Sequence, residues 1–82
     1  KKKSGTVTSS IPGKIVTVEV KKGDEVVEGQ VVLILEAMKM QNEVQAPVTG
    51  TVISVNISEG DAIEANIPLL VIEPVATEED SE

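Results

Sequence analysis

The chain contains no cysteine, no histidine and no aromatic residue. Without cysteine or histidine it cannot form a disulfide, a thiolate nucleophile, a Cys/His zinc site or an imidazole acid–base pair. Without Phe, Tyr or Trp it has no ring to stack on a nucleic-acid base, and its core must consist of Val, Ile, Leu, Met and Ala. These absences remove most enzyme mechanisms.

Basic charge is also scarce, because 7 lysines and no arginine stand against 14 acidic residues, which gives a net charge of −7. We therefore expect no nucleic-acid partner. No apolar run approaches the ~20 residues of a membrane span, and no signal-peptide core follows the first lysines, so we expect no direct membrane insertion. The pattern favours a soluble, cytoplasmic protein, which partners could still tether to a membrane complex.

Eighty-two residues allow one domain with a small core. Residues 1–4 and 76–82 are charged and poor in apolar side chains, which predicts a linker stub and an acidic flexible tail. Between them, residues 5–75 alternate short apolar stretches with Gly, Pro, Asn and Asp, a pattern typical of an all-β domain. The expected strands are 6–9, 14–20, 25–28, 31–37, 40–46, 50–57, 62–65 and 68–73.

An internal repeat organises these strands. A shift of 37 places lays residues 13–36 over residues 50–73 without a gap, with six identical positions and mostly matching polarity at the others. Such a match indicates two copies of one supersecondary unit. Two copies are too few for a solenoid, so the repeat predicts a sandwich or flattened barrel with quasi-twofold symmetry.

The glycines suggest turns. Gly23 and Gly60 each follow an expected strand and precede an aspartate, so we expect a positive φ at both. The next turn has Gly29 in one copy and Asn66 in the other, the two residue types that best accept the left-handed conformation. We also attribute the glycines at positions 13 and 50 to turn geometry, since none of the four fits a phosphate loop.

Lys39 is the best candidate for a working residue. The strands 31–37 and 40–46 flank a two-residue connection, Met38 and Lys39, which places this lysine at a hairpin tip. Such hairpins favour turns with positive φ, normally supplied by Asn-Gly or Asp-Gly, so Met-Lys is a poor choice for stability. A locally unfavourable pair at a tip indicates that function selected it.

Residues 36–40, Glu-Ala-Met-Lys-Met, together with the preceding apolar strand and the following Ala46, Pro47 and Gly50, resemble the biotinyl domain of biotin carboxyl carrier proteins. The resemblance extends over residues 11–73. It implies two four-stranded antiparallel sheets with quasi-twofold symmetry, a barrel-sandwich hybrid. The gapless repeat leaves no room for the protruding thumb of some carriers, so the domain is similar to the thumbless type.

The resemblance also implies a function. Biotin would be attached covalently to Lys39 by a biotin protein ligase, which would recognise Glu36, Ala37, Met38 and Met40. The modified domain, itself non-catalytic, would carry a carboxyl group between the active sites of biotin carboxylase and carboxyltransferase or decarboxylase subunits. No residue is assigned a catalytic role.

Other interpretations remain open at this point. A lipoyl carrier shares the fold and the hairpin lysine, but typically resembles Asp-Lys-Ala at the tip, and an unmodified interaction domain is a third class. A lone hairpin lysine is usually a solubilising charge, and Glu36 and Glu43 are more simply a solvated face than an acid–base pair. For Met40, core packing and recognition by the ligase are both open, whereas for Met38 we favour recognition by the ligase.

Overall fold

A computed structural model describes residues 5–75, which form eight β-strands and no helix. All eight strands expected from the sequence are present. The predicted linker stub and acidic tail lie outside the described residues, and no helix within 5–75 could cross a membrane. The strands are β1 (Thr6–Val7), β2 (Gly13–Val18), β3 (Glu25–Val26), β4 (Val31–Ala37), β5 (Met40–Gln45), β6 (Gly50–Val55), β7 (Ala62–Ile63) and β8 (Leu70–Pro74).

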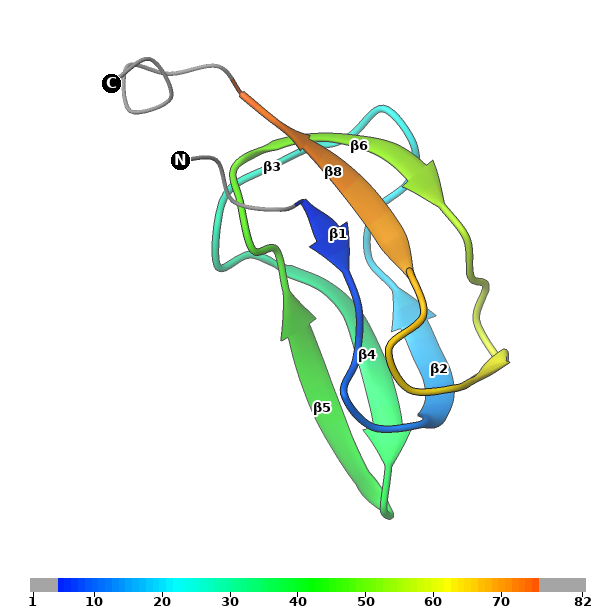
Figure 1. The fold of residues 1–82 in the computed structure, drawn as a ribbon. Coiled ribbons are helices and arrows are strands. Elements are labelled where there is room, and N and C mark those ends of the chain that lie inside the picture. The colour runs from blue at the N-terminus through cyan, green and yellow to red at the C-terminus, as the bar shows by residue number, and fades with distance from the viewer. Residues whose placement is uncertain (1–4, 76–82) are drawn as a thin grey trace.

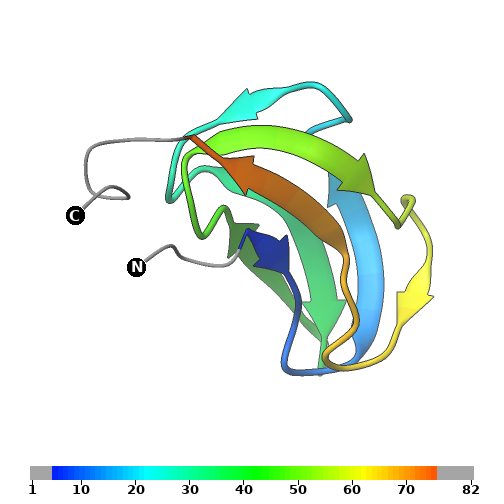
Figure 2. The ribbon, with the colours of Figure 1, turned by 45° about the horizontal axis from the view of Figure 1, so that its top comes forward.

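The strands form two four-stranded antiparallel sheets stacked on each other, as seen in Figure 1 and, after rotation, in Figure 2. One sheet has the strand order β1-β8-β6-β3 and is called the terminal sheet here, because it contains the first and last strands. The other has the order β5-β4-β2-β7 and is called the hairpin sheet. The all-β sandwich expected from the repeat is therefore confirmed.

The quasi-twofold symmetry holds for strand order and for single hydrogen bonds. A shift of 37 residues converts the order of the terminal sheet into that of the hairpin sheet, strand by strand. The N–H of Gly23 donates to the carbonyl of Val52 at 2.8 Å, and the N–H of Gly60 donates to the carbonyl of Ile15 at the same distance. Each repeat therefore holds the other through the same backbone contacts.

The core lies between the two sheets and is aliphatic throughout. Side chains alternate along the strands, so one face of each sheet is buried against the other. At 25 cal/mol per Å² or so, burial of apolar area is the main term that stabilises such a chain. The largest fully buried side chains are Ile15, Val32, Leu33, Leu35, Val52, Leu69, Leu70 and Ile72.

The turns confirm part of the glycine prediction. Gly23 and Gly60 have φ values of 96° and 93°, and the equivalent pair Gly29 and Asn66 have values of 91° and 66°. The turns at 29 and 66 begin earlier than expected, so β3 and β7 stop at residues 26 and 63. The connections 19–24 and 56–61 match in length, which leaves no thumb between β2 and β3.

The prediction for Gly13 and Gly50 was wrong, because neither residue has a positive φ. Both begin a strand, and both lie too close to a neighbouring strand for a side chain. A Cβ on Gly13 would lie 2.4 Å from the carbonyl oxygen of Glu36, and a Cβ on Gly50 would lie 2.0 Å from that of Glu73. Close backbone approach therefore explains these two glycines.

Candidate functional site

The β4–β5 hairpin ends in the two-residue connection predicted from the sequence. Ala37 and Met40 are the last pair in the register, which leaves Met38 and Lys39 as the turn. Their φ values are 55° and 67°. Both are left-handed, as a primed turn requires, although neither residue type favours that conformation. The turn geometry expected at this hairpin is confirmed.

The turn projects into solvent at one end of the sandwich, where Figure 1 shows the hairpin extending beyond the neighbouring strands. Met38 is 82% exposed, Met40 is 64% exposed, and Lys39 is exposed as well. Met40 is therefore not part of the core. Two apolar side chains exposed to water beside a primary amine form a surface whose burial by a partner would make the free energy of binding more favourable.

The base of the hairpin is packed tightly. Leu35 and Ala37 are 1% and 4% exposed. Gly13 at the start of β2 approaches them so closely that an added Cβ would lie 3.2 Å from the Cβ of Ala37. This tight packing leaves the strand ends that carry the exposed turn little room to move.

Asn42, three residues after Lys39, contacts the backbone of both strands of the hairpin. Its half-buried side-chain amide donates to the carbonyl oxygen of Met40 at 3.2 Å, with a longer contact of 3.5 Å to that of Leu35. The first contact holds the backbone immediately after Lys39. The second reaches across to β4, so a single side chain links both strands that carry the turn.

We predict that Asn42→Ala lowers the free energy of unfolding by about 1 kcal/mol, the usual net value of an intramolecular hydrogen bond. Asn42→Asp should lower it further, because a carboxylate would face the same carbonyl oxygens without a proton to donate. Urea unfolding measures both. Gln41→Ala is the matched control on the solvent face and should stay within about 0.5 kcal/mol of the parent. Equal stability of all three variants would contradict the structural role of Asn42.

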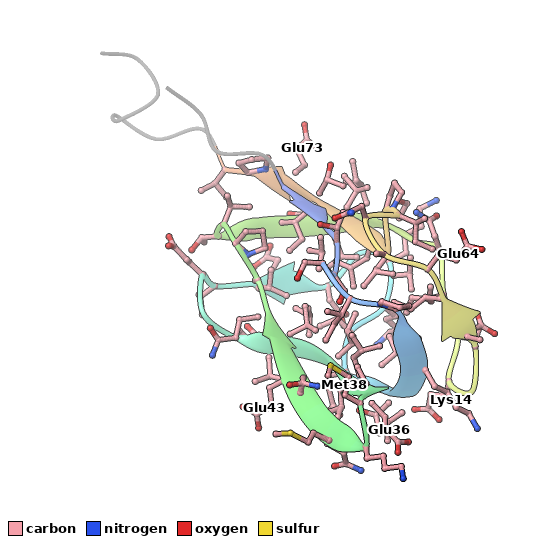
Figure 3. The ribbon with its side chains drawn as sticks, turned by 60° about the horizontal axis from the view of Figure 1, so that its bottom comes forward. Lys14, Glu36, Met38, Glu43, Glu64 and Glu73 are labelled. Carbon is pink, nitrogen blue, oxygen red and sulfur yellow. The ribbon has the colours of Figure 1, made fainter. Side chains whose placement is uncertain are left out.

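Two carboxylates lie on the outer face of the hairpin sheet near the turn, as Figure 3 shows for Glu36 and Glu43. Glu36 stands opposite Lys14 on β2 and Gln41 on β5, whereas Glu43 stands opposite Ile34. The two acids are thus not a cross-strand pair. Both are exposed, which supports their interpretation as a solvated acidic face.

The structure brings the five predicted site residues together at the hairpin, but in different environments. Met38, Lys39 and Met40 form the exposed end, Glu36 lies on the outer face, and Ala37 is buried beneath the turn. Direct recognition of these residues by a ligase stays a prediction. Ala37, because of its burial, supports the turn from inside.

Sequence reasoning missed two supporting residues, Asn42 and Gly13. Nothing in a single sequence indicates that the Asn42 amide turns back onto the backbone of its own hairpin. The role of Gly13 did have a signal, because its repeat equivalent, Gly50, is also glycine while neither is followed by aspartate.

Comparison with known proteins agrees with this geometry. Residues 4–72 match the model of a protein family described as "Biotin-requiring enzyme". The chain belongs to this family of biotinyl domains. The match includes the entire hairpin, the first repeat and all but the last residue of the second, and biotin is accordingly its covalently bound cofactor. The biotinyl domain expected from residues 36–40 is confirmed, and the lipoyl alternative is not favoured.

Curated relatives match about half of the chain at high identity. It is 63% identical over 41 residues to the glutaconyl-CoA decarboxylase subunit gamma of Acidaminococcus fermentans, with 50% of this chain and 28% of that protein covered. It is 56% identical over 43 residues to the biotin carboxyl carrier protein of acetyl-CoA carboxylase from Solanum lycopersicum, with 52% and 61% covered. The matched segments thus make up only part of each relative.

Solved structures extend the similarity to the whole fold. The urea carboxylase of Kluyveromyces lactis superposes with a TM-score of 0.78 at 30% identity, covering 89% of this chain and 6% of that chain. A single-chain, multi-domain long-chain acyl-CoA carboxylase gives a TM-score of 0.80 at 25% identity, covering 99% and 8%. The biotinyl domain therefore resembles a small part of two large carboxylases.

Proposed function

We propose that Lys39 is the attachment residue for biotin, and that the domain of residues 5–75 carries a carboxyl group between active sites of a biotin-dependent carboxylase, transcarboxylase or decarboxylase. The observation that supports this most directly is the position of Lys39 at an exposed, left-handed turn within the family match. Of the four lysines in that match, only this one lies on the turn between two exposed methionines.

The chemistry of attachment suits this position. The neutral amine of Lys39 would attack the acyl carbon of an activated biotin, an amide bond would form, the activating group would leave and the amine would lose a proton. This requires an unhindered primary amine on a flexible stem. Biotin supplies the reactivity for carboxyl transfer, so the domain itself would be non-catalytic and would contribute position and reach.

The proposal also names partners. A biotin protein ligase would close over the apolar tip, and Glu36, Met38 and Met40 offer it one charged and two thioether contacts, with Ala37 holding the turn beneath. Carboxylase and carboxyltransferase or decarboxylase subunits would receive the modified lysine in turn. Several relatives with these activities are parts of larger enzymes, which supports such an assembly. We place this assembly in the cytoplasm.

The test is attachment in the 82-residue chain. Incubation with a biotin protein ligase, biotin and ATP should add one biotinyl group, and peptide mass spectrometry should locate it on Lys39. Incubation with a lipoate ligase and lipoate is the matched control and should add nothing. A biotinyl group on another lysine, or a lipoyl group on Lys39 at a comparable rate, would overturn the assignment.

A further inference from the structure

The sulfur chemistry of this chain is concentrated at the turn. The sequence contains two methionines and no cysteine, and it has no histidine, tyrosine or tryptophan that an oxidant could attack instead. Met is ordinarily used to fill gaps in cores. Here the buried cluster is composed of Val, Ile, Leu and Ala, while Met38 and Met40 are 82% and 64% exposed. They flank Lys39 on both sides.

An exposed thioether reacts with peroxides in a two-electron oxidation. The sulfur attacks one oxygen of hydrogen peroxide, an S–O bond forms and the O–O bond breaks. The departing hydroxide takes up the remaining proton as water. The sulfur is oxidised and the peroxide is reduced, with no other reactant. Because hydrogen peroxide is neutral, the acidic face at Glu36 and Glu43 does not repel it.

We propose that Met38 and Met40 are a peroxide-sensitive modification site that controls attachment at Lys39. This rests on the proposed function, in which a ligase closes over the turn. Oxidation converts a flexible apolar side chain into a polar, chiral one with a strongly accepting oxygen. A ligase surface that fits thioethers must then bury that oxygen without a partner, so the oxidised chain is a poorer substrate. Reductases that act on methionine sulfoxide make the change reversible.

The fold should tolerate the modification, because neither thioether contributes to the core. The hydrogen bond that steadies the turn uses the backbone carbonyl of Met40, which the oxidation does not alter. The buried support from Leu35 and Ala37 is likewise untouched. Oxidation at this site therefore changes the recognised surface and leaves the scaffold in place, in contrast to oxidation of a methionine in a core.

The experiment uses the 82-residue chain before biotin attachment. Hydrogen peroxide is added, removed with catalase, and the product is examined by peptide mass spectrometry, thermal unfolding and ligase kinetics. We expect one added oxygen on each of Met38 and Met40 and an unchanged melting temperature. We expect kcat/KM for biotinylation to fall at least about tenfold, since a desolvated polar group without a partner typically costs that much. Methionine sulfoxide reductases A and B with a thiol should restore it.

The double variant Met38→Leu, Met40→Leu is the control. Its ratio of treated to untreated kcat/KM should be one, whatever its own rate, and the single variants apportion the effect between the two positions. Unchanged kinetics of the fully oxidised parent, or an equal loss in the double variant, would overturn the inference but not the role of Lys39. Failure of the untreated parent to accept biotin on Lys39 would instead overturn the proposed function.

Discussion

Lys39→Arg is expected to abolish biotin attachment completely while leaving the domain folded. A guanidinium stays protonated at any pH a ligase tolerates, so the variant offers no neutral nitrogen to form the amide. The backbone at this residue has a φ of 67°, and Arg tolerates it no worse than Lys. We expect the melting temperature to change by less than about 4 °C, as for an exposed substitution. Avidin capture and thermal unfolding measure the two effects.

Lys14→Arg is the matched control, since Lys14 is an exposed lysine on β2 of the same sheet. It should retain full avidin capture at the parent melting temperature. Capture of the Lys39→Arg variant at even a tenth of the parental level would show that another amine is the acceptor. A large drop in its melting temperature would show that the turn lysine stabilises the fold in a way its exposure does not indicate.

Gly50→Ala is expected to destabilise the fold strongly. Its Cβ would lie 2.0 Å from the carbonyl oxygen of Glu73 and 2.9 Å from the Cα of Pro74, both backbone atoms of the adjacent strand. Because β6 lies between β8 and β3, it cannot move away from one neighbour without moving against the other. We predict a loss of about 3 kcal/mol, at the upper end for overpacking, measured by urea unfolding.

The comparison with Gly23→Ala separates steric from torsional causes. Gly23 has a φ of 96° but no atom within 4 Å of its added Cβ. Its substitution should cost only about 1 kcal/mol, the strain of a left-handed alanine. If Gly50→Ala were instead as stable as the parent, the stabilisation from a lower conformational entropy of the unfolded chain would have offset the steric clash. The distance between β6 and β8 at Gly50 would then be larger than described.

The sequence predicted the parts of this protein that depend on local pattern or on the repeat. Alternating apolar residues marked the strands, and the pairing of Gly29 with Asn66 indicated their shared left-handed backbone. The Met38 and Lys39 turn followed from the two strands that flank it. In each case the physical constraint acts within a few residues of the pattern that reveals it.

Features that depend on distant backbone were missed or wrong. Gly13 and Gly50 were attributed to turns. The lack of a following aspartate distinguished them from the turn glycines, but a single sequence does not show that another strand passes where their side chains would be. The sequence did not indicate the structural role of Asn42, since its amide contacts depend on the hairpin twist. The exposure of Met40 could not be settled either, because side-chain parity fails around a tight turn. The role of the two glycines, the contacts of Asn42 and the exposure of Met40 are decided only by how the strands are arranged in space.

The exchange of strands between the two sheets has a consequence for how the domain unfolds. Each sheet takes two strands from the first repeat and two from the second, so a single repeat keeps only its central strand pair, β2 with β4 or β6 with β8, and can complete neither sheet. The halves are interlocked even though their sequences are separable. We therefore expect a single cooperative unfolding transition, with no stable intermediate made of one repeat alone.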